Sequence, residues 1–274
     1  MELEVWGVRG SISASGRGVA KYGGHTPCAL LRSSAGGLLV IDAGTGIKQL
    51  GERLMTGSGK AALKVHILIT HFHLDHITGL PFFAPLYAPQ AAITFYSPLA
   101  AKETEKVLGG LQAGRYFPVA FKETASRKKF LKAAEAGFSV GKFRVSYCPL
   151  NHPQGSVAYR IEEGGRSVIF ATDTEPPENG IDERLAAFIH GATYFICDAT
   201  FTPEEYRIRQ GWGHSTWRDG VNLARAGGVK NLVLSHFNPD HDDARIAGMV
   251  QVAKKEFRKT YAAREGWTVR VDDE

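Results

Sequence analysis

The stretch Thr70-His71-Phe72-His73-Leu74-Asp75-His76 directly follows an apolar run, Val65 to Ile69, that is typical of a buried strand. Residues two apart in an extended chain point to the same side. The first two histidines can therefore bind one metal ion, while the chain turns and the aspartate and third histidine bind another. Three imidazoles with one carboxylate suit zinc or manganese better than magnesium or calcium. The stretch therefore predicts a two-metal site at the end of a strand.

The composition is that of a globular protein. The 274 residues are 43% apolar and 22% charged, enough for a core and too apolar for a disordered chain. Three cysteines without CxxC spacing fit reduced core thiols better than disulfides or a thiolate metal site. The acidic N-terminus and the absence of a long apolar run predict no signal peptide, no membrane span and a cytoplasmic location. The net charge of +5 permits a phosphate-bearing partner without requiring one.

Short β-like runs alternate with helical segments along the chain, and no linker or repeat divides it. We expect an α/β (α+β) fold with two sheets covered by outer helices, in a single domain over 1–274. The last helix is expected over 243–264, capped by Asp242 or Asp243, with an apolar stripe that packs on the core or, alternatively, forms a homodimer face. The irregular segment 111–131 is either a lid or a solvated connection. Strands are expected at 3–8, 29–32, 38–41, 65–69, 93–96, 143–147, 157–161, 168–170, 194–197, 232–234 and 268–271, and further helices at 46–55, 99–111, 183–189 and 216–226.

Three more candidate ligands follow expected strands. His152 lies in Asn151-His152-Pro153, Asp173 in Ala171-Thr172-Asp173-Thr174, and His236 in Leu234-Ser235-His236-Phe237. Catalytic groups in layered α/β folds collect at the carboxyl ends of strands. Each residue alone is explained as a cap or a surface group, but together they complete a ligand set.

The motifs HFHLDH, NHP, ATDT and SHF, in this order, resemble the metallo-β-lactamase superfamily. The resemblance implies a four-layer αββα fold and two divalent ions, with Zn²⁺ expected and Mn²⁺ as the alternative. It further implies a bridging hydroxide and an orienting role for Asp42 behind the ligands. The implied ligands are His71, His73 and His152 for one ion, Asp75, His76 and His236 for the second, and Asp173 as a bridge.

A second motif, Gly211-Trp212-Gly213-His214-Ser215-Thr216, points to phosphate chemistry. His214 stands just before an expected helix, where phosphate is attracted and a histidine can give a proton to a leaving alkoxide. The segment His214, Ser215 and Thr216 is similar to a loop of the ribonuclease Z and cyclic-phosphodiesterase branch. Asp198 stands where that branch has a glutamate, and the match implies that it orients His214. Asp75 could also assist as a base.

The N-terminal segments around Arg9 and His25 are similar to those of phosphonate-pathway cyclic phosphodiesterases. A guanidinium at position 9 fits either a phosphate contact or a structural ion pair. That branch usually has asparagine where this chain has His25, so the role of this position is open. His66 and His190 are expected to be structural, and His241 to lie in a surface loop.

The expected activity is hydrolysis of a small or cyclic phosphodiester, such as a cyclic nucleotide, by attack of the bridging hydroxide with His214 as general acid. Tyr116 or Phe117 would stack on a base. The chain lacks the long Gly/Pro-rich arm with which ribonuclease Z holds transfer RNA, and it has no dense basic cluster, so RNA is the less favoured substrate. The alternatives are a ribonuclease Z-like RNA endonuclease and a carbon-centred hydrolase of the lactamase or thioesterase type.

Overall fold

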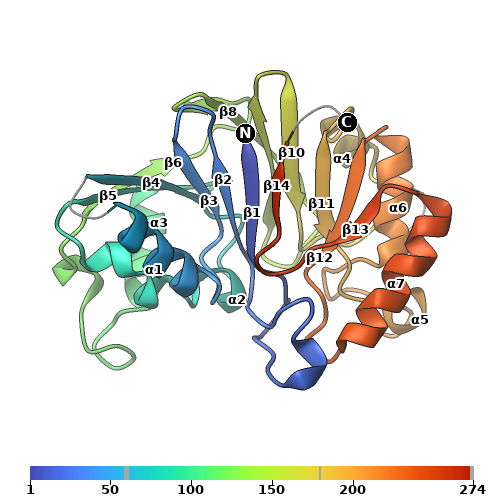
Figure 1. The fold of residues 1–274 in the computed structure, drawn as a ribbon, viewed down its shortest axis with the longest axis horizontal. Coiled ribbons are helices and arrows are strands. Elements are labelled where there is room, and N and C mark those ends of the chain that lie inside the picture. The colour runs from blue at the N-terminus through green and yellow to red at the C-terminus, as the bar shows by residue number, and fades with distance from the viewer. Residues whose placement is uncertain (59–61, 179, 272–274) are drawn as a thin grey trace.

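The fold is a sandwich of two sheets with helices on both outer faces, as the computed structural model shows for residues 1–58, 62–178 and 180–271 (Figure 1). Each sheet contains seven strands among these residues. The helices α1 and α3 cover one sheet, and α4, α6 and α7 cover the other. The expected four-layer αββα architecture is confirmed.

The first sheet holds the N-terminal strands and places its parallel strands next to one another. Short 3₁₀ turns and two helices cover its outer face. The strand order is β14 (Thr268–Arg270), β1 (Glu2–Gly7), β2 (Cys28–Arg32), β3 (Leu38–Ile41), β4 (Leu63–Leu68), β5 (Ala91–Ser97) and β6 (Arg127–Lys132), and the covering elements are α1 (Ile47–Ser58), η2 (Leu80–Phe82), η3 (Ala84–Tyr87) and α3 (Ala101–Gly110).

The second sheet is built by the C-terminal half of the chain. Its strand order is β13 (Thr260–Ala262), β12 (Asn231–Ser235), β11 (Tyr194–Asp198), β10 (Arg166–Ala171), β9 (Ser156–Glu163), β8 (Phe143–Leu150) and β7 (Phe138–Val140). The remaining elements are α2 (Leu74–Ile77), α4 (Glu183–Phe188), α5 (Pro203–Tyr206), α6 (Trp217–Ala226), α7 (Asp243–Glu256), η1 (Arg17–Val19) and η4 (Phe121–Glu123).

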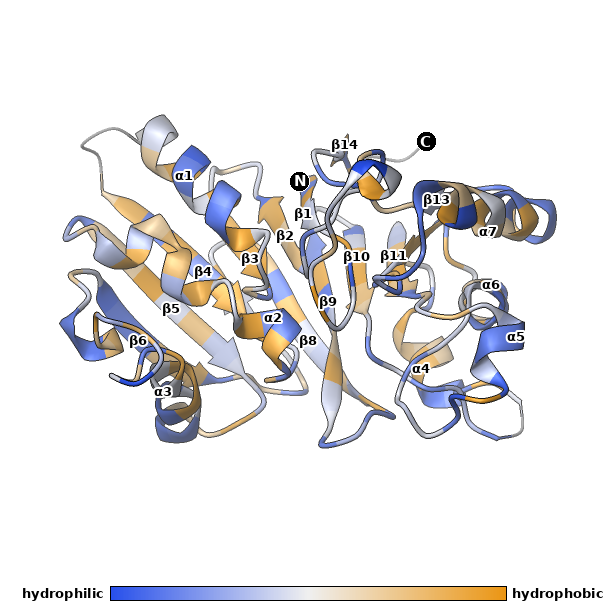
Figure 2. Cartoon of the chain, turned by 90° about the horizontal axis from the view of Figure 1, so that it is seen from below, coloured by the Kyte–Doolittle hydropathy of each residue, from blue (hydrophilic) through white to orange (hydrophobic). Residues whose placement is uncertain are grey.

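The central strands are apolar on both faces, as Figure 2 shows, because each sheet is packed on two sides. In β2 and β3, Leu31 and Leu39 belong to the core between the sheets, whereas Leu30 and Val40 belong to the core beneath α1. Alternate side chains of a strand point to opposite faces, so two adjacent leucines serve two different cores. Packing on both faces holds these strands in place, and the polar residues of the sequence motifs follow their ends.

The sequence prediction was wrong at the C-terminal helix. The helix expected over 243–264 ends at Glu256, and Thr260–Ala262 forms β13 beside β12. Phe257 has an extended backbone, and the Thr260 hydroxyl donates to its carbonyl oxygen at 2.6 Å, so the chain turns back to the sheet. A β-branched and an aromatic residue favour this strand. The expected cap is confirmed, since the Asp242 carboxylate accepts from Arg245 N at 2.7 Å.

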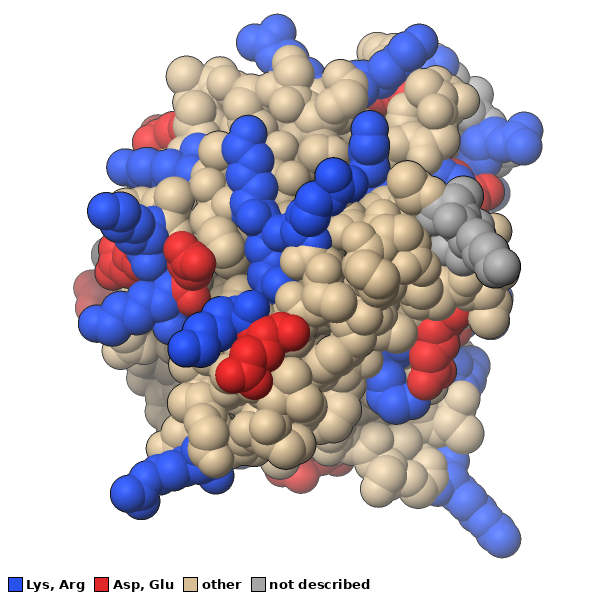
Figure 3. Space-filling model, turned by 90° about the vertical axis from the view of Figure 1, so that its left-hand side faces the viewer, with Lys and Arg blue, Asp and Glu red and all other residues tan. Residues whose placement is uncertain are grey.

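The segment 111–131 ends in a strand that the sequence prediction missed. Its last residues begin β6, the edge strand of the first sheet, which carries exposed cations at Arg127, Lys129 and Lys132. Figure 3 views the molecule from this side and shows Lys and Arg side chains spread among a few acidic ones. Charges on an edge strand oppose pairing with another chain, and they also hide the apolar alternation by which a strand is recognised.

The polar residues singled out by the motifs come together at one edge of the sandwich. The seven expected ligands and Asp42 follow the carboxyl ends of β3, β4, β8, β10 and β12, Asp198 ends β11, and His214 lies in the loop before α6. Since strands from both sheets end at this edge, their loops can face one another across the sandwich. None of the helices of the described residues is long and apolar enough to cross a membrane.

Candidate metal centre and its acid

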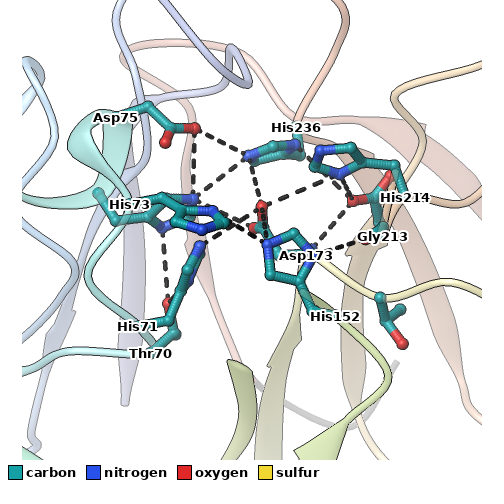
Figure 4. A network of polar contacts seen from close by, with 12 residues as sticks. Thr70, His71, His73, Asp75, His152, Asp173, Gly213, His214 and His236 are labelled. Atoms are coloured by element: carbon teal, nitrogen blue, oxygen red, sulfur yellow. Dashed lines mark hydrogen bonds and ion pairs between the residues drawn. The ribbon is translucent and has the colours of Figure 1, made fainter. Parts of the chain in front are cut away.

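All seven expected ligands converge on one cluster (Figure 4). The first group, His71, His73 and His152, is called the imidazole half-site here. The second, Asp75, His76, Asp173 and His236, is called the carboxylate half-site. Asp173 reaches both groups, with its oxygens 3.1 Å from His76 Nε2 and 3.8 Å from His71 Nε2.

Hydrogen bonds fix the histidine tautomers of the carboxylate half-site. His76 Nδ1 lies 2.8 Å from the Asp42 carboxylate, which accepts its proton. Thr200 Oγ1 already donates to the His236 carbonyl oxygen, so it accepts from His236 Nδ1 at 3.1 Å. Both Nε2 atoms therefore point into the cluster, 3.3 Å apart and within 3.4 Å of the Asp75 carboxylate. Two imidazole nitrogens directed at one point beside a carboxylate suit a shared cation.

The imidazole half-site has the same design. His152 Nδ1 donates to Gly213 O at 2.8 Å, and His73 Nε2 donates to Gln154 Oε1 at 3.0 Å. These bonds leave His152 Nε2 and His73 Nδ1 facing each other at 3.1 Å without a proton between them. The remaining histidine, His71, uses Nδ1 on the Thr70 hydroxyl at 3.2 Å. Its Nε2 is buried and has no hydrogen-bond partner among the described residues.

These donors fit a pair of divalent ions. Burial, together with repulsion from His76, lowers the pKa of His71 to about 2, so this imidazole is a neutral ligand. Burial would raise the pKa of Asp75, but His76 and His236 hold it below its usual range, so the carboxylate is ionised. Neutral imidazoles and ionised carboxylates are the forms that bind metal. Without an ion, the buried His71 Nε2 would remain unsatisfied.

Backbone strain is concentrated at this cluster. Among the residues that the structure describes, the non-glycine positions with positive φ have values of 57–62°. Each is a member of the cluster or hydrogen-bonds to one of its side chains, as Ser11 N does to Asp75 at 2.8 Å. Left-handed backbone costs a non-glycine residue about 1 kcal/mol or more, so it persists where the surroundings enforce it. The positions are Ser11, Asp42, Gln154, Asp173 and His236.

His214 stands beside the cluster and is paired with Asp198. Its Nδ1 lies 2.9 Å from Asp198 Oδ2, and its ring centroid is 5.1 Å from that of His236. Burial alone would lower the pKa of His214, but the Asp198 carboxylate raises it to about 9. The side chain is 12% exposed and protonated at neutral pH, so it can donate a proton next to the metal ligands.

Asp198 is better suited to orient His214 than to bind an ion. Its oxygens accept hydrogen bonds from the backbone N–H groups of Asp173, Thr200 and Ser215 at 2.9–3.1 Å, in addition to the imidazole. Although Asp198 and His214 lie close enough to Asp173 and His236 to form a third donor group, these four bonds occupy the lone pairs that an ion would need.

A model of the beta-lactamase superfamily domain matches residues 38–237 of the chain. This range contains all seven donors and both members of the Asp–His pair. The chain belongs to the beta-lactamase superfamily. The resemblance expected from the histidine motifs is therefore confirmed, and the donor set is that of a metal-dependent hydrolase of this superfamily.

Relatives of this superfamily member include ribonuclease Z enzymes, which belong to the branch that its motifs resemble. It is 25% identical to a ribonuclease Z of Bradyrhizobium diazoefficiens over 267 aligned residues, which cover 80% of this chain and 86% of the relative. Among solved structures, the metallo-beta-lactamase fold protein YhfI of Bacillus subtilis has a TM-score of 0.74 at 18% identity, covering 98% and 99% of the two chains. A diphosphatase from the PhnP family has a TM-score of 0.69 at 19% identity, covering 98% and 97%.

One supporting residue of this superfamily member escaped the sequence analysis. The Glu175 carboxylate accepts from the backbone N–H groups of Gly211 and Gly213 and from the Tyr206 hydroxyl, at 2.7–2.8 Å. It thereby holds the loop that carries His214 and the Gly213 carbonyl that orients His152. Position 175 follows Asp173 by two residues, and this closeness to a ligand was the signal available in the sequence.

The N-terminal candidates are structural. Arg9 is fully buried, and its guanidinium donates to the carbonyl oxygens of Gly23, Asn238 and His241. Full burial contradicts the hypothesis of a phosphate contact, and the alternative of a structural role is met by hydrogen bonds to main-chain oxygens. Burial lowers the pKa of the guanidinium, and the carboxylates of Asp243 and Glu265 lie close enough to oppose this shift. His25 faces Thr45 Oγ1 at 3.2 Å and Gln49 Nε2 at 3.0 Å.

Three of the remaining candidates, Ser215, Thr216 and His241, are buried, whereas Tyr116 is a surface group. Thr216 caps α6, with its hydroxyl accepting from Arg218 N and Asp219 N, and the Ser215 hydroxyl donates to Thr174 O. His241, expected in a surface loop, is buried and pairs with Glu205 at 2.9 Å, because α5 packs over it. Tyr116 is 80% exposed.

Proposed function

We propose that this chain hydrolyses small phosphodiesters with two divalent ions, expected to be Zn²⁺, bound by the seven donors of the cluster. The observation that carries the proposal is the Asp198–His214 pair, held 2.9 Å apart beside the ligands. A hydrolase that attacks carbon has less need of a cationic imidazole at this point, whereas a leaving alkoxide from phosphorus needs a proton. The ribonuclease Z relatives support the same chemistry.

Two ions bound here would supply an activated water and positive charge for the phosphoryl oxygens. The chain's own residues do the rest. Five imidazole and two carboxylate ligands would leave net positive charge on two divalent ions, which favours an anionic diester. Hydrolysis bonds a water oxygen to phosphorus and breaks the bond to the leaving oxygen. His214 Nε2 gives that oxygen its proton, while Nδ1 stays on Asp198, which stabilises the cation before transfer.

An RNA endonuclease of the ribonuclease Z type is the second candidate. The relatives named ribonuclease Z favour it, as do the exposed cations of β6 and the exposed Lys102 and Lys106 of α3, which packs beside β6. These cations are interspersed with acidic side chains, including Glu103 and Glu105 on the same helix. A mixed surface gives weaker attraction for a long polyanion than a dense basic patch does, because fewer phosphates are neutralised. We therefore favour a small diester, with cyclic nucleotides as the first substrates to examine.

The test is His214→Ala, assayed on a 2′,3′-cyclic nucleotide and on bis-p-nitrophenyl phosphate. Loss of a general acid lowers turnover of the cyclic nucleotide by about 10²–10⁴-fold, because its leaving group is an alkoxide. The p-nitrophenyl diester suffers much less, since its leaving group needs no proton. Metal content, measured by mass spectrometry, stays at the wild-type level.

The matched control is His190→Ala, since His190 is an exposed histidine in the turn between α4 and the amino end of β11, whereas the cluster lies at the carboxyl ends of the strands. It should leave both activities unchanged. An equal loss on both substrates with His214→Ala would assign His214 a structural role. Tight, salt-sensitive binding and cleavage of transfer RNA precursors, with inert cyclic nucleotides, would establish the RNA alternative.

A further inference from the structure

A largely apolar cavity of about 640 Å³ opens beside the imidazole half-site. Thr70, His71 and His73 form the wall nearest the cluster. The other walls belong to α3 with the residues just before it and to the β8–β9 hairpin. Its apolar lining includes Phe72, Leu99, Val107, Tyr147, Pro149 and Val157.

The charge of the lining excludes an anionic occupant. The lining contains one carboxylate, that of Glu103, and among the described residues no lysine or arginine lines the cavity. A further phosphate placed here would meet a carboxylate and no cationic side chain of the lining, and it would exchange water for largely apolar walls. The volume lies within the range of sites that hold small molecules, about 300–1,000 Å³. The occupant is therefore neutral and mostly apolar.

Two polar side chains of the lining, Ser156 and Gln154, suit a planar ring that carries hydrogen-bonding atoms on its edge. Ser156 lines the cavity, is 4% exposed, and its hydroxyl has no hydrogen-bond partner among the described residues. Gln154 also lines the cavity, and the same side chain holds His73 at 3.0 Å. A ligand in the cavity thus contacts a residue that positions a metal donor.

His214 lies on the other side of the cluster. It does not line the cavity, and Figure 4 shows His71 and His214 on opposite sides of Asp173. The oxygen that receives the proton of His214 must leave on the His214 side. A group in the cavity is consequently attached to phosphorus through a different oxygen.

We infer that this cavity binds a neutral aromatic ester group of the substrate, the group that stays on phosphorus when the other ester bond is broken. This inference rests on the proposed function and narrows its substrate class to diesters with one aromatic or similarly flat apolar substituent. A nucleobase or a substituted phenyl ring has the required shape. Burial of such a ring provides binding energy without any charge.

The experiment compares two diesters with the same leaving group, phenyl p-nitrophenyl phosphate and methyl p-nitrophenyl phosphate. The metal-loaded wild-type enzyme should favour the phenyl ester in kcat/KM by about tenfold or more, because a buried ring gains at least about 1.4 kcal/mol. Val107→Phe fills the cavity from α3 and should bring the ratio close to one. Val252→Phe, the same change at an exposed position of α7, should leave the ratio as it was.

A binding measurement separates this inference from the proposed function. Calorimetry should show tighter binding of phenylphosphonate than of methylphosphonate to the metal-loaded enzyme, a difference that Val107→Phe removes. If neither diester is hydrolysed but the phosphonates differ in this way, the proposed activity fails and the cavity assignment stands. If both diesters are cleaved with equal kcat/KM by the wild type, the cavity assignment is overturned and the activity stands. The wild-type ratio decides even if Val107→Phe does not fold.

Discussion

The imidazole half-site is neutral and partly open, whereas the carboxylate half-site is charged and closed. His73 of the former is half-buried, and its outer nitrogen is held by the exposed Gln154. All four residues of the latter are buried, and its His76 is held by a buried carboxylate, Asp42. Charge and enclosure both favour retention of a cation. Two ions bound side by side would therefore differ in affinity, with the exchangeable ion next to the apolar cavity.

The largest effect should come from Asp173, whose carboxylate reaches both the imidazole half-site and the carboxylate half-site. Asp173→Ala removes a charged donor that both groups share, so it should reduce the bound metal to one ion or none. Diesterase activity should fall by about a thousandfold or more, because each lost 1.4 kcal/mol is a factor of ten and metal chemistry supplies several. Metal analysis alongside turnover checks this. A variant that kept two ions and most of its activity would show that the halves are independent.

The second effect concerns the carboxylate half-site alone. Asp42→Asn removes the charge behind His76 and should weaken one of the two ions by about 10–100-fold, leaving the other unchanged. Titration of the metal-free protein with zinc would show the tighter of the two binding steps moved towards the weaker one, whereas the wild type has more widely separated steps. Equal weakening of both steps would contradict the assignment of Asp42 to one half.

The third effect concerns the proposed acid, His214, which lies beside the cluster. Burial alone would lower the pKa of His214, and Asp198 raises it to about 9. A general acid acts in its protonated form, so activity on an alkoxide leaving group should be present below that pKa and lost as pH rises through it. Asp198→Asn removes the raising charge, and the alkaline limb of kcat/KM should move to lower pH by about one unit or more. An unmoved alkaline limb would assign it to another group.

The smallest effect is expected at the open half-site. Gln154→Ala frees the outer nitrogen of His73 in a position where water can replace the amide oxygen. The affinity for one ion should fall by less than about tenfold, the lower limit for such supporting residues. Competition with a weak chelator measures this. A loss as large as that in Asp42→Asn would show that enclosure does not distinguish the halves.

The sequence predicted the ligands far better than their supports. His71, His73 and Asp75 were predicted because they lie within five residues of one another, after a strand that is recognisable by its apolar run. Thr200, Gln154 and Glu175 hold ligands or their loops through pairings over long sequence distances, and such pairings leave no spacing pattern.

The secondary structure was also predicted best where a local sequence pattern reveals it. Strands with two apolar faces were predicted, whereas β6 was missed because lysines and arginine mask its pattern. Helix α7 was predicted too long, because an apolar stripe alone cannot show that the chain turns back to pair with β12. The phosphate contact of Arg9 and the surface position of His241 were wrongly predicted because burial beneath distant loops depends on tertiary packing.

The left-handed residues around the cluster have a consequence for how this protein can change. Each would gain stability from glycine, which adopts positive φ without a steric cost, yet each has a side chain or a neighbouring N–H in the cluster. Selection for heat resistance alone should therefore favour glycine at these five positions. Glycine would remove the side chains that they contribute to the cluster. A stabilised variant that still hydrolyses its substrate must find its gains elsewhere in the chain. The five positive-φ residues thus mark positions at which folding stability is given up for the polar contacts of the cluster.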